Sequence, residues 1–577
     1  MLWMHSMATT NSSAPLAPKG GSFLIEQRRP HEIFTPEDFT EEHRQIARTA
    51  TAFVNREVMP AAAEIEAKNF TVTRKLLRAA GDLGLMGADV PEAYGGTEMD
   101  KVSSAIIAEA ISKLGSFSVA FSAHTGIGTL PIVWYGTAEQ KQTYLPKLAT
   151  GEWIAAYALS EASSGSDALN CRARAVLSPD GSEWVLNGEK MWISNSGFAD
   201  LFTVFAKVDR EKFSAFLIPR GTPGFAVGAE EHKLGIRGSS TCPLILNDCR
   251  IPAANLLGEI GKGHHIAFNI LNIGRFKLAA AAVGGAKNSL SDAIAYSKER
   301  KAFGKAICEF GLIQEKLAEC AAGIYAGEAM VYRTIGMIDS ALAGVVGNDS
   351  REIQKCIERY AVECSILKVW GSELLDMVVD HTVQIFGGYG YVEEYPAERA
   401  YRDSRINRIF EGTNEINRLI ITGFLMKRAM AGELPLLAAI KQVMDEVTGP
   451  APAGGVLDAA KRTTLFAAGV ASQRYMQGLA EQQEIMGALA DCIIEVYAME
   501  SCLLRAEKSG NANRAAMARY YCAKSMGVIE QAARKVAAAS AEGDMRRTQM
   551  AILRRLVKVE IEDTVGLGRQ IARSVLG

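Results

Sequence analysis

The chain has 577 residues, of which 48% are hydrophobic, and its formal net charge is −2. At roughly 150 residues per domain, this length predicts three or four domains with sizeable apolar cores. The near-zero charge argues against nucleic acid or an anionic membrane as the main partner. Ten scattered cysteines without a Cys-x-x-Cys pair predict reduced thiols. No zinc-ligand spacing and no phosphate loop is present, so we predict no metal site.

The first 33 residues are expected to form a disordered tail. The first twenty are rich in Ser, Thr and Ala but contain no arginine and no apolar core. They therefore resemble neither a secretory signal nor a transit peptide. The uncharged run Leu278–Ala286 is too short to cross a bilayer. We expect a bacterial-type chain located in the cytoplasm.

Residues 34–155 are predicted to form a helical domain. Thr35 can cap a helix, and Pro36 suits its first turn. Ile46 and Ala50 then follow at helical spacing. After this region the helical spacing of apolar residues ends.

Residues 156–265 are predicted to form a small β domain. Short β-rich runs such as Leu201–Val208 and Phe213–Ile218 are separated by Gly, Pro, Asp and Asn. The pair Asn187-Gly188 is a strong hairpin signal, so we expect a turn there.

Helical patterns resume over residues 266–430 and again over residues 431–577. The Gly- and Pro-containing segment 446–455 lies in the second region, and we expect it to be a mobile linker. The predicted fold class is thus mainly α with a central β domain. Basic residues among apolar ones at 546–558 could lie on an anionic membrane, or form the solvated face of a packed helix.

Two segments of the predicted β domain could face a flat, polar ligand. Tyr157–Asp167 offers hydroxyls, glycine and backbone N–H groups, although an ordinary Ser/Gly loop is the alternative. In Asn187–Asn195, Trp192 and Ser194 fall on one face of a strand. An aromatic wall suits a flat cofactor, and a core tryptophan is the alternative.

Three segments of the region 266–430 carry charge or glycine. Arg275 lies one helical turn from Asn272, and an arginine in an apolar helix usually pairs with a carboxylate or reaches an anion. Glu299–Lys305 is typical of a solvated helix end. The glycines of Gln384–Tyr391 permit close packing or phosphate approach, but they do not follow a strand as a dinucleotide fingerprint requires.

Glu411 is the most informative residue of the chain. Burial beside Ile409 and Phe410 would raise the pKa of its carboxyl, which favours a general base near neutral pH. Gly412 would let a ligand approach the backbone. The alternative is a helix start, capped by Thr413 and with an acid in the first turn.

Together these segments resemble the acyl-CoA dehydrogenase family of flavoproteins over about residues 40–425. The resemblance implies a helical domain, a β domain and a four-helix bundle. It also implies non-covalent FAD and oxidation of acyl-CoA thioesters to trans-2-enoyl-CoA.

By this resemblance, Glu411 removes the pro-R α-proton while the β-hydrogen leaves as hydride to flavin N5. The base's own backbone N–H and a flavin ribityl hydroxyl would bind the thioester carbonyl and stabilise the developing enolate, as an oxyanion hole does.

The resemblance also assigns residues to ligands. Residues matching family FAD contacts are Tyr157, Leu159, Ser160, Gly165, Ser166, Trp192, Ile193, Ser194, Arg300, Phe303, Phe310, Gln384, Gly387, Gly388, Thr413 and Glu415. Residues matching substrate contacts are Ser166, Asn272, Arg275 and Gly412. In this family some FAD contacts come from a neighbouring subunit, which implies a homodimer.

The subgroup is suggested by the additional module. Residues 431–577 resemble the extension of very-long-chain acyl-CoA dehydrogenases and of a relative involved in complex I assembly. Gly126 and Gly128 could open a deep acyl channel or serve helix packing, and Pro131 stands near where some long-chain members have glycine. In that subgroup the module is linked to peripheral membrane association.

The resemblance therefore predicts an FAD-dependent dehydrogenase of long-chain acyl-CoA in fatty acid β-oxidation, with an electron-transfer flavoprotein as acceptor. An acyl-CoA oxidase and a flavoprotein that assists assembly of a respiratory complex are the alternatives.

Overall fold

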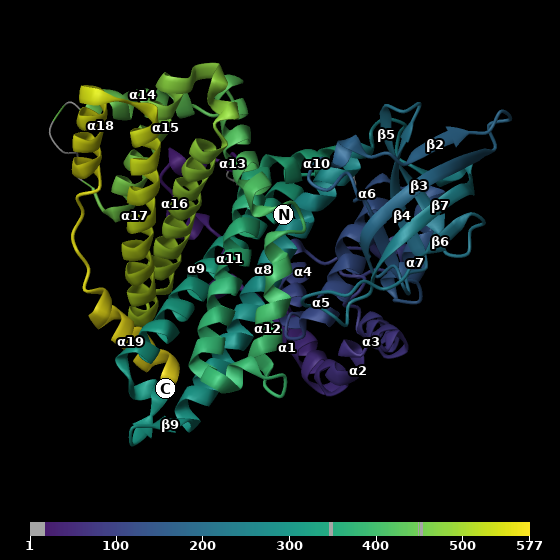
Figure 1. The fold of residues 1–577 in the computed structure, drawn as a ribbon, viewed down its shortest axis with the longest axis horizontal. Coiled ribbons are helices and arrows are strands. Elements are labelled where there is room, and N and C mark those ends of the chain that lie inside the picture. The colour runs from purple at the N-terminus through teal and green to yellow at the C-terminus, as the bar shows by residue number, and fades with distance from the viewer. Residues whose placement is uncertain (1–17, 346–349, 448, 450–453) are drawn as a thin grey trace, which may run out of the picture.

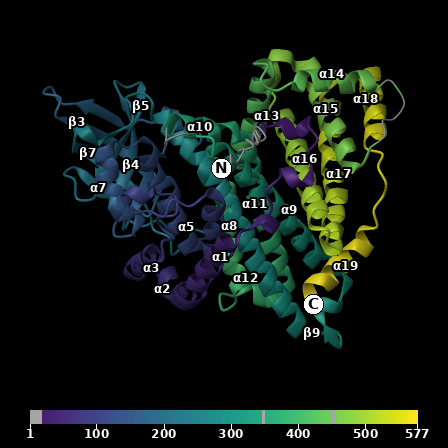
Figure 2. The ribbon, with the colours of Figure 1, turned by 180° about the vertical axis from the view of Figure 1, so that it is seen from behind.

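A computed structural model describes residues 18–345, 350–447, 449 and 454–577. Figure 1 shows three parts side by side, and the reverse view in Figure 2 shows the same order. The β domain and the first helices lie at one end, long helices of a bundle lie in the middle, and the additional helical module lies at the other end. The predicted fold class, mainly α with a central β domain, is confirmed.

The N-terminal region is helical, as its periodicity predicted. Thr40 caps the first long helix, where its hydroxyl accepts a hydrogen bond from the His43 backbone at 3.2 Å. Pro36 begins a short 3-10 helix, Pro36–Asp38, just before it. The helices are α1 (Glu41–Phe53), α2 (Ala62–Glu66), α3 (Phe70–Asp82), α4 (Lys101–Ile111), α5 (Gly115–Ser122), α6 (Leu130–Tyr135) and α7 (Ala138–Ala149).

The predicted disorder of residues 1–33 is wrong for residues 18–33. Phe23 is 3% exposed and its ring lies 4.7 Å from that of Tyr497. The Gly21 N–H donates to the Glu363 carboxylate at 2.7 Å. Burial of an aromatic ring offsets the entropy of ordering this segment. Residues 1–17 lie outside the described residues.

The β domain is one eight-stranded sheet with the order β6-β7-β3-β2-β4-β5-β8, in which β1 pairs with β4. The pairs β1–β4 and β2–β4 are parallel, and the other pairs are antiparallel. Strand β4 coincides with the run predicted from sequence. The strands are β1 (Ala155–Ala158), β2 (Arg174–Leu177), β3 (Glu183–Ser194), β4 (Leu201–Val208), β5 (Lys212–Pro219), β6 (Phe225–Val227), β7 (Thr241–Pro252) and β8 (Leu256–Leu257).

The hairpin turn predicted at Asn187-Gly188 is wrong, because both residues lie inside β3. The register of β3 against β7 shifts between Leu186 and Gly188, which marks an irregularity of the β-bulge type. A Cβ at Gly188 would lie 2.7 Å from the backbone of Ala173, so the close approach requires glycine. Bulges and turns use the same residue types, and the sequence signal does not separate them.

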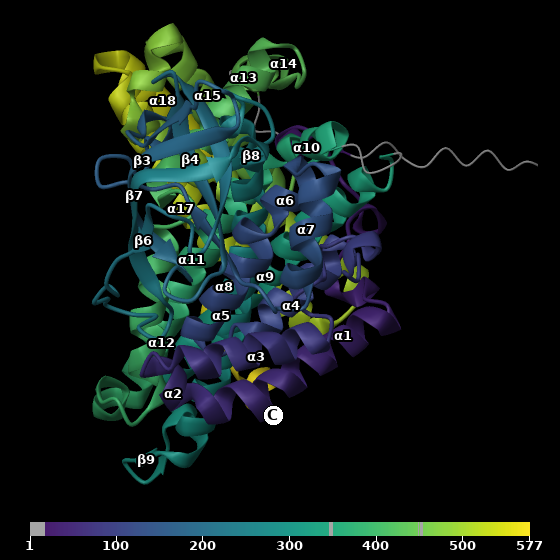
Figure 3. The ribbon, with the colours of Figure 1, turned by 90° about the vertical axis from the view of Figure 1, so that its right-hand side faces the viewer.

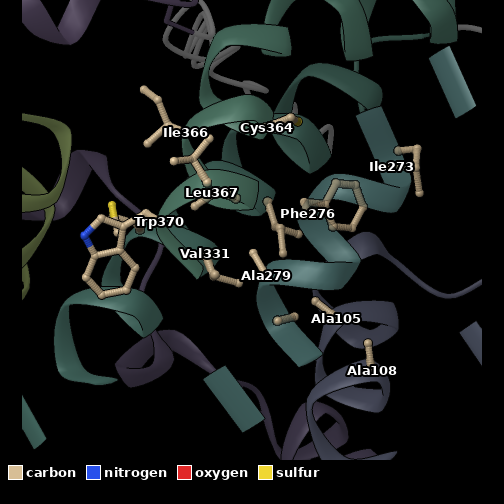
Figure 4. Close-up of a cluster of buried hydrophobic side chains, with 14 of the residues drawn as sticks. Ala105, Ala108, Ile273, Phe276, Ala279, Val331, Cys364, Ile366, Leu367 and Trp370 are labelled. Atoms are coloured by element: carbon tan, nitrogen blue, oxygen red, sulfur yellow. The ribbon is translucent and has the colours of Figure 1, made fainter. Parts of the chain in front are cut away.

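The bundle is built on α8 (Gly263–Glu299), which packs against α4, α9 and α11. Figure 4 shows the core where they meet, with Phe276 of α8 among side chains of α4, α9 and α11. Among the described residues, α8 alone is long and apolar enough to cross a membrane, but 72% of that stretch is buried, as expected for a core helix. The other elements are the hairpin β9 (Lys301–Ala302) and β10 (Lys305–Ala306), then α9 (Gly311–Leu342), α10 (Ser350–Arg359), α11 (Ala361–Phe386), α12 (Pro396–Ser404) and α13 (Asn414–Met430).

The additional module lies behind the bundle when the molecule is viewed from the β domain (Figure 3). A buried ion-pair network joins the two parts: Glu500 binds Arg333 of the bundle and Lys461 of the module, each at 2.6 Å. On α18, Leu553 and Leu556 are buried. Residues 448 and 450–453 of the predicted linker lie outside the described residues. The helices are α14 (Leu436–Glu446), α15 (Val456–Tyr475), α16 (Gln483–Ser509), α17 (Ala512–Ser540), α18 (Gly543–Leu556) and α19 (Thr564–Leu576).

Candidate active site

Glu411 lies in a tight loop between α12 and α13. Its φ is +58° and that of Gly412 is +83°, so two consecutive residues adopt left-handed backbone. This conformation is uncommon for a residue with a side chain and persists where surrounding contacts enforce it. Thr413 caps α13, where its hydroxyl accepts from the Ile416 N–H at 3.3 Å. Thr413 therefore caps a helix as expected, and Glu411 lies outside that helix, two residues before the cap.

Side chains from two helices hold this loop through its carbonyl oxygens. Arg275 of α8 donates from Nε to the Glu411 carbonyl at 3.2 Å. The amide of Asn417 donates to the carbonyls of Gly412 at 2.8 Å and Thr413 at 3.1 Å. These bonds fix where the Glu411 side chain leaves the backbone.

Glu411 is half-buried, and its carboxyl makes no direct ion pair within the described chain. Its Oε2 atom is inaccessible and has no hydrogen-bond partner in the described chain. Burial raises its pKa to about 7, against the opposing attraction of Arg275 and Lys368. The direction predicted from sequence is confirmed. The expected cause is wrong in part, because Ile409 is 50% exposed.

Gly274 provides the close contact that Ile409 does not. A Cβ at this position of α8 would lie 2.5 Å from Oε2 of Glu411. The carboxyl therefore lies against bare helix backbone, and a larger residue would displace it. On the sheet side, the hydroxyl of Tyr157 is also buried and has no partner among the described residues, and the charge of Glu411 contributes to its raised pKa. Two unsatisfied buried polar atoms at one site indicate that a ligand completes it.

Arg275 is only 6% exposed, and its partners are neutral. Besides the Glu411 carbonyl, it donates to Oδ1 of Asn272 at 3.0 Å and reaches the Ser365 hydroxyl at 3.5 Å. The expected carboxylate partner is thus not in direct contact. Arg275 and Asn272 lie together, as their spacing predicted. Arg275 binds the Glu411 loop, and Asn272 binds Arg275.

The loop after β1 is fixed by a buried ion pair. Lys190, which is fully buried, binds Glu161 at 2.7 Å and the Leu159 carbonyl at 3.2 Å. Glu161 also accepts from the Arg172 N–H at 2.6 Å. Predicted contacts on this loop differ in exposure. Leu159 and Ser160 are half-buried, whereas Gly165 and Ser166 are exposed.

Trp192 is not a core residue. It is 59% exposed, has a φ of +59° and sits at a second register shift of β3, between Lys190 and Ile193. Ile193 is buried and Ser194 half-buried. A large aromatic face is thus displayed at the edge of the β domain, which fits an aromatic ligand rather than the core-tryptophan alternative.

A second group of predicted residues gathers at the far end of the bundle. Phe303 is 96% exposed and packs edge-on against Phe310 at 6.1 Å. Nearby, Arg300, Gly387 and Gly388 line an open cavity of about 560 Å³. No heavy atom lies within 4 Å of a Cβ built on either glycine. The residues of this group are Arg300, Phe303, Phe310, Gln384, Gly387 and Gly388.

Within one chain, the structure does not bring this second group to Glu411. Figure 1 shows β9, next to Phe303, at the bottom of the bundle, whereas β3, which carries Trp192, and α13, which begins three residues after Glu411, lie in the upper half of the view. The predicted residues thus form two half-sites. Thr413 and Glu415 stay with the Glu411 half, at the start of α13.

Sequence reasoning missed four residues of the Glu411 half-site: Gly274, Lys368, Asn414 and Asn417. Asn417 and Asn414 carry a weak signal, because amides in the first turn of a helix often bind nearby backbone or side chains. Lys368 could have been suspected as a single cation in the apolar stretch of α11. Within the described residues, no cluster of His, Cys, Asp or Glu could hold a metal ion. All ten cysteines are free thiols.

Comparison with known families covers most of the chain. Residues 40–152, 156–249 and 261–426 match the N-terminal, middle and C-terminal domains of acyl-CoA dehydrogenase. Residues 459–555 match a further acyl-CoA dehydrogenase C-terminal domain. The chain belongs to the acyl-CoA dehydrogenase family. The additional module thus matches a domain that occurs in acyl-CoA dehydrogenases.

Relatives of the family support this over the full length. A probable acyl-CoA dehydrogenase of Bacillus subtilis (strain 168) is 48% identical over 96% of this chain and 97% of that protein. The mitochondrial very long-chain specific acyl-CoA dehydrogenase of Macaca fascicularis is 34% identical, over 88% of this chain and 82% of that protein.

Two solved structures show the same fold. An acyl-CoA dehydrogenase from Bacillus anthracis, crystallised in complex with FAD, has a TM-score of 0.95 and 47% identity over 97% of this chain and 99% of that one. A structure described as the electron transferring flavoprotein of Acidaminococcus fermentans has a TM-score of 0.61 and 35% identity, covering 68% of this chain and 98% of that one.

Proposed function

We propose that the protein is an FAD-dependent dehydrogenase that converts long-chain acyl-CoA to trans-2-enoyl-CoA in fatty acid β-oxidation, with Glu411 as the base. The observation that carries the proposal is the Glu411 carboxyl itself. It is buried against Gly274, its pKa is raised to about 7, and Oε2 has no partner in the described chain. A base with these properties is ionised often enough near neutral pH and is free to accept a proton.

The residues present fit FAD. Trp192 offers an exposed aromatic face beside the Ser160–Ser166 loop, which suits the flavin ring. Gly387 and Gly388 leave open space in a cavity where Arg300 supplies positive charge, which suits a pyrophosphate. Bound FAD accepts the hydrogen and electron pair that leave the β-carbon of the substrate.

In the proposed reaction, the Glu411 carboxylate takes the α-proton. Its backbone N–H donates to no acceptor in the described chain, so it is free to bind the thioester carbonyl. A donor placed where negative charge develops is typically worth roughly 3 kcal/mol of transition-state stabilisation. Arg275 holds the Glu411 carbonyl, in the next peptide unit, and so helps to fix the direction of both groups.

A cavity farther along α8 bears on the length of the substrate. Ala281 and Gly285 lie about two and three turns along α8 from Gly274 and on its face, because seven and eleven residues complete near-whole turns, and Ala282 adjoins Ala281. These three residues line a cavity of about 140 Å³ whose other walls come from α5, α11 and α12. Small residues along this line favour a long substrate.

The two glycines of the predicted channel differ. Gly126 is buried, yet no heavy atom lies within 4 Å of a Cβ built there, which supports the channel interpretation at that position. Gly128 packs closely, with its Cβ position 2.9 Å from the side chain of Ala155, which fits the packing alternative.

The separation of the two half-sites supports a homodimer. A second copy could bring its Phe303 and Gly387 to the Trp192 edge of the first, which would complete an FAD site and cover an almost fully exposed aromatic ring. The family resemblance supports an electron-transfer flavoprotein as the acceptor. A cytoplasmic location completes the proposal, with peripheral contact at the inner membrane through the exposed basic residues of α18, because its Leu553 and Leu556 are buried in the protein.

The test is anaerobic mixing of the purified holoprotein with straight-chain acyl-CoAs of increasing length, followed by flavin bleaching. We expect bleaching to be fastest with long chains. If no straight-chain acyl-CoA bleaches the flavin, the proposed dehydrogenase activity is refuted. Rapid peroxide formation in air would favour the oxidase alternative. FAD binding without bleaching, together with capture of a respiratory complex, would favour the assembly factor.

A further inference from the structure

Lys368 is a buried cation beside the candidate base. It lies on α11 and its exposure is 0%. Its Nζ donates to Oδ1 of Asn414 at 2.7 Å, and within the described part of the chain no carboxylate lies at ion-pair distance from this nitrogen. An ammonium group in such a place is costly unless nearby negative charge compensates it. Its presence therefore requires an explanation.

The charged groups that face Lys368 come from four elements. Glu411 precedes α13, Glu415 is in its first turn, Glu373 is on α11 itself and Arg275 is on α8. Glu373 is already bound by the Arg418 guanidinium at 2.8 and 3.0 Å.

The two remaining carboxylates differ in their surroundings. Glu415 is exposed to solvent, which screens its charge. Glu411 has an inaccessible carboxylate oxygen without a partner in the described chain, so it is the group with most to gain from the charge of Lys368.

The two groups also depend on each other for their protonation states. Burial lowers the pKa of Lys368 to about 7, and Glu411 opposes that change. On the facing side, Arg275 and Tyr157 are the other titratable groups that sense Glu411. Two buried groups that titrate in the same range share their protons, so the charge of one depends on the other.

Lys368 is also tied mechanically to the base loop. Asn414, which accepts its hydrogen bond, is the first residue of α13 and follows Gly412 and Thr413 directly. The Asn414 amide donates in turn to Ser372 at 3.0 Å and Glu373 at 2.9 Å. Lys368 thus fixes the helix start that positions the strained Glu411 backbone.

We propose that Lys368 is a positioning residue that keeps Glu411 ionised in its buried site and anchors the loop that carries it. The inference rests on the proposed role of Glu411 as the base. After Glu411 has taken a substrate proton, the nearby ammonium favours release of that proton to solvent and so restores the carboxylate for the next turnover.

The test compares Lys368→Met with Ser372→Ala. Methionine fills similar volume without charge, whereas the serine variant removes another Asn414 partner and keeps the charge. The readout is the pH dependence of the rate of anaerobic flavin reduction, with FAD content measured alongside. Loss of a neighbouring cation raises a carboxyl pKa, typically by about one unit or more at this range. We expect the acidic limb to move up by about one pH unit in Lys368→Met, with a rate loss of about fivefold at pH 7.

In Ser372→Ala the acidic limb should stay where it is. If the acidic limb of the pH profile does not move in Lys368→Met while FAD content stays normal, the proposal is overturned. Infrared titration of the wild-type holoprotein tests the proposal even if the methionine variant does not fold. The carboxyl band that Glu411→Gln removes should titrate near pH 7, and a band that stays protonated above pH 9 would also overturn the proposal. If Glu411→Gln itself keeps normal turnover, the proposed base is wrong, whatever Lys368 does.

Discussion

The two half-sites of this chain are built in opposite ways. The Glu411 loop is enclosed by α8, α11 and α13, and its carbonyls are bound by Arg275 and Asn417. The Phe303 end is open, with an exposed ring and two glycines that face empty space. Reaction chemistry needs a group held in place before substrate arrives, whereas a shared cofactor surface is completed by what binds to it. The contrast predicts that changes at the first site affect rate, and changes at the second affect FAD and assembly.

Among changes to the surroundings of the base, the largest expected effect is that of Gly274→Ala. The added methyl would meet the Glu411 carboxyl at 2.5 Å and displace it. A misplaced general base loses much of its contribution, so we expect flavin reduction to slow about a thousandfold while FAD content stays normal. Stopped-flow absorbance measures this.

Gly423→Ala is the matched control, because no heavy atom lies within 4 Å of a Cβ at that helical position. It should leave the rate unchanged. A normal rate in Gly274→Ala would mean that the carboxyl can move without cost, which contradicts a prebuilt site.

The next effect concerns the ion pair below the flavin-facing loop. Glu161→Gln would leave Lys190 buried without its counter-ion. We expect a loss of about 3 kcal/mol in the free energy of unfolding of the β domain, together with weaker FAD retention. Urea unfolding followed by flavin fluorescence measures both.

An exposed ion pair on the same sheet offers the comparison. Glu183 and Arg250 join β3 to β7 at 3.4 Å, and both are about half exposed. Glu183→Gln should cost less than about 1 kcal/mol. Equal losses in the two variants would show that burial of the Glu161 pair does not matter.

A third prediction concerns the dependence of stability on pH. Folding raises the pKa of Glu411 from 4.5 to about 7, so the folded state holds its proton more tightly than the unfolded chain does. The stability from this group is present at low pH and is lost as pH rises through 7. Glutamine does not ionise, so Glu411→Gln removes that loss. The free energy of unfolding of the variant, relative to that of the wild type, should therefore rise by on the order of 2 kcal/mol between pH 5 and pH 8.

Glu415→Gln serves as the control, because the pKa of Glu415 is lowered by hydrogen bonds at the start of α13. The effect of Glu415→Gln should have the opposite sign, so this variant should be less stable than the wild type at high pH. Thermal unfolding at both pH values measures the difference, and a pH-independent difference for Glu411→Gln would contradict the raised pKa.

The smallest effect is expected at the open half-site. Phe303→Ala removes a ring that is 96% exposed in one chain, so it should hardly change the unfolding of the isolated fold. If a second copy covers that ring, dimerisation and FAD affinity should weaken about tenfold. Sedimentation and FAD titration measure these.

Ile561→Ala is the control, since Ile561 is 94% exposed and lies between α18 and α19 of the additional module. Unchanged dimerisation and FAD affinity in Phe303→Ala would remove the argument that the two half-sites meet across subunits.

Local signals in the sequence were sufficient for part of this picture. The run Leu201–Val208 is a strand with those bounds, and Thr413 caps a helix, because alternation and capping depend on neighbours in sequence. Asn187-Gly188 failed because a bulge and a turn use the same residues. The exposure of Trp192 depends on a left-handed backbone that no pattern of polarity reveals.

The candidate site shows the same limit over longer range. The apolar neighbours of Glu411 suggested a raised pKa, and the direction is confirmed. Its close contact with Gly274 joins residues far apart in the chain, and so does its electrostatic link to Lys368. Such contacts are set by how α8, α11 and the base loop pack, which one sequence does not state.

The most direct test of the account is Glu411→Gln in anaerobic stopped flow with a long-chain acyl-CoA. Glutamine keeps the shape of the side chain and removes its basicity. The account predicts normal FAD content and a loss of flavin bleaching of about ten-thousandfold or more. Bleaching within about tenfold of the wild-type rate would contradict it, because proton abstraction would then depend on another residue.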